Sequence, residues 1–199
     1  MELSPLAREK LAQIGELTQE EKLRLKHCQY LASVLSDYFT AKLSSEDLWK
    51  ELRKQKEEGR EFLLRETQLR LIDAINLSGS ERDYERKRRG ILAVETLKNE
   101  SNYTALEQGL DSIQNLRRQY REESKKTLKE IKGKIEKQVR LAAQQLAAQA
   151  GARGAPIDVQ GSVEATARAS PEWKDFISKH ESIFSQKLKD NLARLRQMV

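Results

Sequence analysis

The stretch that decides the fold spans residues 102–150 and reads NYTALEQGLDSIQNLRRQYREESKKTLKEIKGKIEKQVRLAAQQLAAQA. It has no proline, and its only glycines are Gly109 and Gly133. Its apolar residues recur almost always at steps of three or four, which predicts one amphipathic α-helix with a single apolar stripe. The stripe consists of Tyr103, Leu106, Leu110, Ile113, Leu116, Tyr120, Leu128, Ile131, Ile135, Val139, Ala142 and Leu146. At a rise of roughly 1.5 Å per residue, the helix would be about 70 Å long. A compact core of a chain this size is narrower than that, so we expect part of the helix to project or to pair with another chain.

Helical patterns also occur in the ranges 5–14, 18–42, 45–75, 80–98 and 171–198. Thr18 lies three residues ahead of Glu21, which is the spacing of a capping box and predicts a helix start. Ser170 followed by Pro171 combines an N-cap serine with a proline at the first helical position, which predicts another start. The connections between successive helices are short, and short connections favour antiparallel neighbours.

The range 45–75 is predicted as one helix with a weak middle. Ser44 or Ser45 can cap its first turn, where Glu46 and Asp47 complement the helix dipole. Gly59 and the dense charges around it make residues 53–60 the least regular part of this helix.

A change of composition follows the long helix. Gly151, Gly154 and Pro156 cannot continue a helix. Residues 157–163 then alternate between apolar and polar side chains, which indicates either a short strand or small hairpin, or an extended segment packed on the helices. The expected organisation is a helical bundle with a long projecting helix over 1–150, a linker over 151–170, and a C-terminal helix over 171–199 that packs back on the long helix.

The composition suits long amphipathic helices better than a compact enzyme. Hydrophobic residues make up 38% and charged residues 34% of the 199, against typical globular values of about 45–50% and about 25%. No apolar run approaches the roughly 18 residues of a membrane span. The start of the chain lacks the pattern of a secretory signal, and Cys28 is the only cysteine, so we expect a cytoplasmic protein without disulfides or thiolate metal sites. The predicted fold is an all-α, elongated bundle or long helical hairpin with coiled-coil character, in which the helix at about 102–150 is much longer than the others.

Positive charge gathers on residues 117–140, which hold ten Lys or Arg and four Asp or Glu, a surplus equal to the net charge of +6. Three of these acids lie four residues ahead of a base and predict ion pairs along the helix: Glu122, Glu130 and Glu136. The bases at 117, 121, 125 and 129 have no acidic residue four positions ahead of them to form such an ion pair. Like charges at this spacing cost a few tenths of a kcal/mol per pair, which the phosphates of a nucleic acid or a ribosome surface would offset. The candidate contacts for such an anion are Arg117, Arg118, Arg121, Lys125, Lys129 and Lys132.

A solvated helix face is the simpler interpretation of these bases, because only Tyr120 interleaves with them and no stacking platform is present. A second basic cluster, residues 86–89, lies near the start of the preceding helix, where the helix dipole disfavours cations.

Catalytic, cofactor and metal sites are not expected. His27 and Cys28 are adjacent on a helix and therefore point about 100° apart. His180 is expected to be a packing residue, and no phosphate-binding loop or nucleophile motif occurs. Trp49 and Trp173 lie near helix starts, where they either anchor the helix ends on the core or contact a partner.

These observations favour a non-enzymatic scaffold or adaptor that presents helical surfaces to another protein and self-associates through the long helix. The alternative is a nucleic-acid- or ribosome-associated factor that uses the basic residues of that helix. A small-molecule substrate is not expected.

Overall fold

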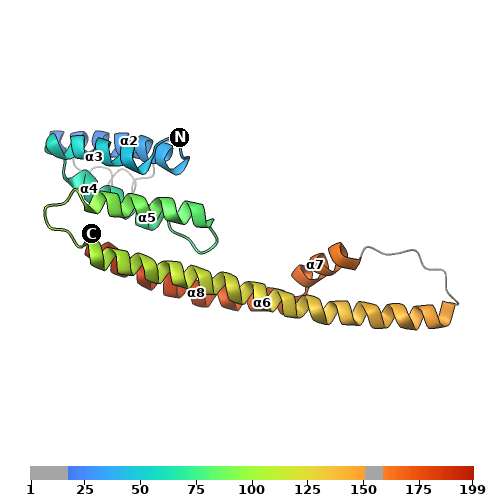
Figure 1. Ribbon diagram of the computed structural model, residues 1–199. Coiled ribbons are helices and arrows are strands. Elements are labelled where there is room, and N and C mark those ends of the chain that lie inside the picture. Colours follow the sequence, from blue (N-terminus) through green and yellow to red (C-terminus); the bar gives the residue numbers. More distant parts are fainter. Residues whose placement is uncertain (1–17, 151–158) are drawn as a thin grey trace, which may run out of the picture. The chain divides into compact units, whose positions relative to one another are not determined.

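The computed structural model describes residues 18–150 and 159–199, without the side chains of residues 143, 146–150 and 159–162. Within these ranges the chain forms seven α-helices and no strand (Figure 1), so the predicted all-α class is confirmed there. The helices are α2 (Gln19–Phe39), α3 (Ser45–Glu57), α4 (Phe62–Asp73), α5 (Glu81–Glu95), α6 (Tyr103–Ala150), α7 (Val159–Ala169) and α8 (Pro171–Met198). The helix predicted over residues 5–14 lies outside the described residues.

The helices belong to two compact units, each assembled from separate parts of the chain. Unit 1 contains the described residues up to Leu71 together with Glu81–Ser101. Unit 2 contains Ile72–Ser80 and Asn102–Val199. The short segment Ile72–Ser80 therefore connects α4 to α5 in sequence but packs as part of unit 2.

The first two helices of unit 1 begin where their capping residues predict. The Thr18 hydroxyl accepts a hydrogen bond from the Glu21 amide at 3.2 Å, and the Glu21 carboxylate accepts one from the Thr18 amide at 2.8 Å. At the start of α3, Ser44 and Asp47 form the same reciprocal pair, with distances of 3.1 and 3.3 Å. These bonds satisfy backbone donors that the first turn of a helix leaves without partners. Both predicted starts are confirmed, with Ser44 rather than Ser45 as the cap of α3.

The single helix predicted over 45–75 is wrong, because the chain breaks it at Gly59. This residue has φ +79°, in the left-handed region that glycine adopts without steric cost. The Gly59 amide donates to Lys56 O and the Arg60 amide donates to Gln55 O, both at 2.9 Å. This pair of bonds is a Schellman motif, which satisfies the last carbonyls of α3 and turns the chain toward α4.

A buried polar cluster joins α4 to α5. The Gln68 side-chain amide donates to the Glu95 carboxylate at 2.8 Å and to Ile91 O at 3.1 Å. Glu95 is fully buried, and Lys98 pairs with it at 2.9 Å. Buried carboxylates are tolerated only with such partners, so these contacts fix the facing sides of the two helices.

Tyr38 brings α2 very close to α5. Its side chain is 0% exposed, its hydroxyl donates to Arg86 O, and it lies 2.9 Å from Ser45 Oγ. A Cβ atom at position 90 would lie 2.9 Å from the Tyr38 hydroxyl oxygen and 3.0 Å from Leu71 Cδ1. Glycine is therefore required at position 90 for the helices to approach this closely.

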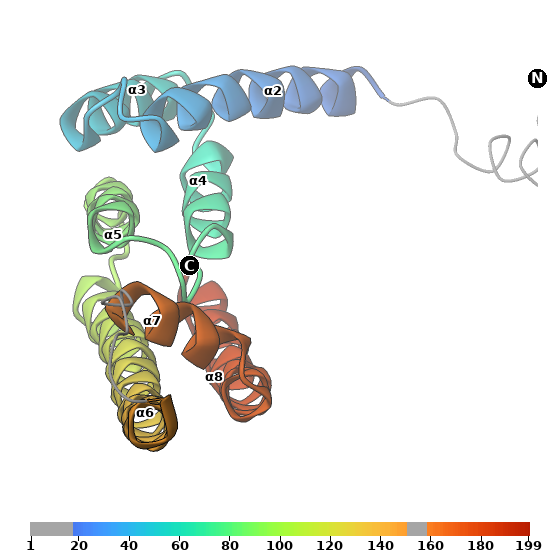
Figure 2. The same cartoon turned by 90° about the vertical axis from the view of Figure 1, so that its right-hand side faces the viewer.

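Unit 2 is built around α6 and α8, which lie side by side in opposite directions (Figures 1 and 2). At one end the Asn102 side chain donates to Met198 O at 3.2 Å, and farther along Lys134 pairs with Glu172 at 2.6 Å. The start of α8 is as predicted, since the Ser170 hydroxyl accepts from the Trp173 amide at 3.2 Å. The cover that α8 provides for α6 thus runs from the start of α6 to the neighbourhood of Lys134.

An aromatic cluster lies between these two helices. The His180 ring is buried and stacks on Tyr120 and Phe176, with centroid distances of 4.9 and 4.8 Å. Its Nε2 lies 3.1 Å from Tyr120 O, and the Phe184 ring lies tilted against it at a centroid distance of 4.4 Å. His180 is the packing residue that its position beside Phe176 and Phe184 predicts.

The extended segment or strand predicted over 157–163 is wrong from Val159 onward, where α7 begins; residues 157–158 lie outside the described ranges. Val163 and Ala167 are buried, and Glu164 pairs with Lys132 of α6 at 2.5 Å. The two apolar residues are four apart, which is helical spacing, and this periodicity continues past the short stretch that resembles a strand. Tertiary packing on α6 therefore decides the conformation.

Among the described helices, none combines the length and the hydropathy that a membrane span requires.

Two glycine substitutions should have opposite effects on stability. We expect Gly90→Ala to lower the free energy of unfolding by about 1–3 kcal/mol, because its methyl group overpacks the Tyr38 contact. Gly133→Ala should raise it by about 0.5–1 kcal/mol, since a Cβ there meets nothing within 4 Å and alanine favours the helix. Thermal and urea denaturation of the two variants beside the unsubstituted protein measure both effects. A Gly90→Ala protein as stable as the parent would contradict the close approach.

Candidate functional site

Arg117 is not available to an external anion. Its side chain is only 1% exposed, and its guanidinium group donates to three backbone carbonyls of the segment Ile72–Ser80. Nε donates to Asn76 O at 3.0 Å, and one terminal nitrogen donates to Gly79 O and Ser80 O at 2.5 and 3.2 Å. Arg117 is therefore a structural residue that fixes this segment on α6, and its prediction as an anion contact is corrected.

The geometry of the helix explains why the predicted row does not lie on one face. A step of four residues turns the chain by about 400°, so each member is displaced by about 40° from the one before it. Arg117 starts on the side of the apolar stripe, and successive members move away from it. Arg117 is buried, Arg121 is half-buried, and Lys125 and Lys129 are exposed. The row therefore winds around α6, from a side chain buried in unit 2 to side chains exposed to solvent.

The cations that do share an exposed side of α6 are Arg118, Lys125 and Lys129, which are seven and four residues apart. Arg118 donates to the Asn115 side chain at 3.1 Å. Lys125 and Lys129 form no hydrogen bond or ion pair with a described residue. These three cations are the part of the predicted basic patch that remains open to solvent.

Lys132 is already neutralised by its ion pair with Glu164, and this contact lowers the pKa of the Glu164 carboxyl. Lys134 pairs with Glu172 of α8 rather than with Glu130 one turn away, and this contact raises the pKa of the Lys134 ammonium. Two bases of the long helix thus hold α7 and α8 in place.

The two tryptophans lie in different units. Trp49, in α3, is half-buried; its ring nitrogen donates to the Thr96 hydroxyl at 3.0 Å, and Arg53 lies over its ring. Trp173, in the first turn of α8, is half-buried and lies against Phe176 at 5.6 Å. Trp49 therefore contacts the residue that follows α5, whereas the contact of Trp173 lies within α8 itself. Neither ring is fully exposed, and the choice between an anchor and a partner contact stays a prediction for Trp173.

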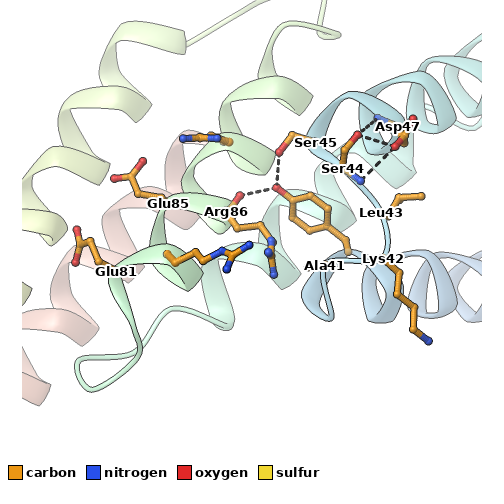
Figure 3. Close-up of a pocket in the computed structure, with 12 residues that line it drawn as sticks. Ala41, Lys42, Leu43, Ser44, Ser45, Asp47, Glu81, Glu85 and Arg86 are labelled. Atoms are coloured by element: carbon orange, nitrogen blue, oxygen red, sulfur yellow. Dashed lines mark hydrogen bonds between the residues drawn. The ribbon is translucent and has the colours of Figure 1, made fainter.

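The second basic cluster divides between the interior and a pocket. Lys87 is buried and pairs with Asp83 at 2.6 Å. Arg86 and Arg89 line a pocket of about 750 Å³ together with Arg82. We call this cavity the α5 pocket; Figure 3 shows it. Its other lining residues are Tyr38, Ala41, Lys42, Leu43, Ser44, Ser45, Asp47, Glu81 and Glu85.

The α5 pocket lies where the turn between α2 and α3 meets α5, entirely within unit 1. Arg86 is half-buried, and its guanidinium group donates to Phe39 O at 3.1 Å, which fixes it at the end of α2. Tyr38 lines the pocket, and its hydroxyl donates to Arg86 O and lies 2.9 Å from Ser45 Oγ. Burial raises the pKa of Tyr38, so the hydroxyl stays protonated at neutral pH.

The sequence pattern indicates only a small part of this pocket. Residues 86–89 form a basic cluster in the sequence, and Arg82 belongs to the same helix face, four residues before Arg86. That spacing was readable from the sequence. The opposite wall, around Lys42 and Ser44, is about forty residues away in the chain, and no sequence pattern reveals that tertiary contact.

In the described part of the chain, no three His, Cys, Asp or Glu side chains gather closely enough to hold a metal ion. The α5 pocket is lined by three arginines and Lys42 together with the carboxylates of Asp47, Glu81 and Glu85. Its guanidinium groups are the ones suited to binding an anion.

Replacing Arg117 should destabilise unit 2. In Arg117→Met the carbonyls of Asn76, Gly79 and Ser80 lose their charged donor, and we expect the free energy of unfolding to fall by about 2–4 kcal/mol. The matched control is Arg118→Met, the same change at the next position, where the side chain is exposed and the expected loss is below about 0.5 kcal/mol. Urea denaturation followed by circular dichroism compares them, and equal losses would rule out the proposed role of Arg117.

The comparisons with known proteins identify a family but no activity. A family model described as "Family of unknown function (DUF6657)" matches residues 49–198, which is well over half of the chain. The match includes α5 and the bases of α6, but not Lys42 or the rest of the turn that completes the α5 pocket. No curated protein and no solved structure matches the chain. The chain therefore belongs to DUF6657, a protein family of unknown function.

Proposed function

We propose that this protein is a non-enzymatic scaffold or adaptor that presents helical surfaces to other proteins and self-associates through the distal part of α6. The observation that carries the proposal is the end of the apolar stripe. Ile131 is 2% exposed beneath its neighbours in unit 2, whereas Val139, two turns farther along the same stripe, is 39% exposed. Ala142, the next stripe residue, is also exposed.

The apolar stripe of α6 extends beyond the part of the helix that α7 and α8 contact. The contact of Glu172, in the first turn of α8, reaches only as far as Lys134, and α7 contributes its ion pair at Lys132. Beyond these positions α6 continues to Ala150. An amphipathic helix gains stability mainly from burying its apolar face, so the exposed continuation favours another helix as a partner.

A second copy of this chain is the partner that fits best. The exposed stripe continues the face that α6 uses within unit 2, and the small side chain of Ala142 permits close approach of two helices. Charges of both signs flank the stripe at Glu136, Lys137 and Arg140. Such flanking charges pair across helical dimers and set their alignment. We propose an elongated helical assembly with coiled-coil character, centred on α6.

The proposal includes no substrate or cofactor and places the protein in the cytoplasm. Cys28 is a free thiol, which is compatible with a reducing compartment.

Substitutions on the stripe should separate the copies. We expect Val139→Glu with Ala142→Glu to convert a dimer to a monomer, because facing carboxylates would replace apolar contacts at the seam. Size-exclusion chromatography with light scattering measures the mass at several protein concentrations, and circular dichroism verifies that helicity is kept.

Leu141→Glu is the matched control. Leu141 is 59% exposed, more than Val139, but it lies about 160° around the helix from Val139 and about 100° from Ala142, outside the stripe. This variant should remain dimeric. A parent protein that stays monomeric at every concentration would refute self-association, and dissociation by Leu141→Glu alone would refute the assignment to the stripe.

A second candidate function is binding of nucleic acid through the exposed cations of α6. It is favoured by Lys125 and Lys129, which have no ion pair with a described residue and lie on one side of the helix with Arg118. Phosphate would relieve the repulsion between these cations.

Charge reversal distinguishes the two functions. Arg118→Glu, Lys125→Glu and Lys129→Glu together should leave the oligomeric state unchanged and abolish retention of RNA or DNA, if nucleic acid binds here. Each phosphate contact contributes about one unit to the slope of log affinity against log salt concentration, so the parent slope should approach −3 and vanish in the triple variant. Filter binding at several salt concentrations measures it, and tight binding that survives the triple variant would dispose of this site.

A further inference from the structure

We propose that the α5 pocket binds a compact phosphate-bearing anion, held by Arg82, Arg86 and Arg89. This proposal is independent of self-association and of the cations on α6, since the pocket lies entirely within unit 1 and the proposed seam lies within unit 2.

Three guanidinium groups share one side of α5. Arg86 lies four residues and Arg89 seven residues after Arg82, so the three side chains extend from nearly the same face of two helical turns. Like charges at this spacing repel one another when no anion lies between them. All three line the same cavity, where an anion can contact them together.

The middle arginine is fixed, and the outer two are unengaged. Arg86 is held at the end of α2 by its bond to Phe39 O at 3.1 Å. Arg82 and Arg89 are exposed and form no hydrogen bond or ion pair with a described residue. A positioned guanidinium with an unengaged one on either side suits a phosphate group, because each planar guanidinium can donate two parallel hydrogen bonds to its oxygens.

The facing wall carries groups of both signs that already have partners within the protein. The N-terminal end of α3 lies there, at Ser44 and Ser45, and the partial charge of a helix N-terminus favours anions. Lys42, from the preceding turn, also lines the pocket and lies 3.7 Å from Asp37.

The acidic groups of the pocket are already engaged. Asp47 accepts a hydrogen bond from the Ser44 hydroxyl at 2.6 Å, and this contact lowers the pKa of its carboxyl. Glu81 and Glu85 have interactions of their own, and they lie on the side of Arg86 away from Ser44 and Asp47 (Figure 3). The unengaged charges are therefore the cationic ones, although three acids and four bases line the cavity.

The lining favours a ligand recognised by its phosphate rather than by a nucleobase. Tyr38 is the only aromatic residue among the lining residues; it is 0% exposed and its hydroxyl is occupied. Base recognition uses exposed aromatic faces for stacking, and the pocket offers none. Pyrophosphate or a small phosphomonoester matches these groups.

Titration calorimetry of the full chain with inorganic pyrophosphate, at constant ionic strength, tests the site. We expect saturable binding of one pyrophosphate per chain. Arg82→Gln and Arg89→Gln should each weaken binding roughly tenfold, as the loss of a charge-assisted hydrogen bond implies. Both side chains are exposed, so the variants should fold normally, and circular dichroism verifies this.

Arg65→Gln is the matched control, because Arg65 is an exposed arginine of α4 in the same unit that does not line the pocket. It should bind pyrophosphate within twofold of the parent, and citrate should bind the parent more weakly than pyrophosphate does. The proposal is overturned if pyrophosphate does not bind saturably, or if Arg65→Gln weakens binding as much as Arg82→Gln. It is also overturned if Lys125→Glu, rather than the pocket variants, abolishes binding, or if citrate binds as tightly as pyrophosphate.

Discussion

The constraint on which unit 2 depends is that the apolar face of α6 extends farther than any one neighbour can cover. Up to about Lys134 the chain covers this face with three separate pieces: α8 along the first part of the helix, α7 near Lys132, and the segment Ile72–Ser80 near Arg117. Each piece is held by a polar contact as well as by apolar packing. A short helix needs one partner, whereas a long amphipathic helix organises the parts of the chain that come before and after it.

Arg117 illustrates how a charged residue becomes part of an interior. Its position on α6 faces the apolar stripe, so its charge is desolvated, and desolvation is tolerated only when the guanidinium donors are satisfied. The carbonyls of a turn provide acceptors without any regular secondary structure. Arg118, the next residue, lies about 100° farther around the helix and is exposed. Two adjacent arginines therefore have different roles.

Local signals in the sequence predicted the starts of helices well, because a cap is a short-range interaction. Thr18, Ser44 and Ser170 each accept the amide hydrogen bond that their spacing implies. The sequence indicates an irregular stretch around Gly59 but not the end of a helix there. A glycine alone does not reveal whether its backbone adopts the left-handed conformation that ends a helix. The helix at residues 159–163 was missed because a stretch of five residues fits two periods, and packing on α6 decides between them.

The site was harder to predict than the fold. The basic row of α6 was interpreted as one face, although the drift of about 40° per step follows from helix geometry alone and separates Arg117 from Lys129 by about 120°. The α5 pocket depends on contact between residues 38–47 and 81–89. These segments are about forty residues apart in the chain, and the periodicity of a single sequence does not indicate which distant segments pack together. Tyr38 in particular reads as an ordinary core residue until its hydroxyl is located against Arg86.

The assignment of Ile72–Ser80 to unit 2 has a consequence for synthesis of the protein. Translation completes the sequence of unit 1 at Ser101, so its two segments can associate once they have left the ribosome and before all of α6 has followed. The residues between them must wait until α6 emerges before Arg117 can bind their carbonyls. Neither unit corresponds to one uninterrupted segment, so a fragment that starts at Asn102 would carry a buried arginine without its acceptors. A proteolytic cut between Asn76 and Gly79 would therefore divide the carbonyls that Arg117 binds between two fragments.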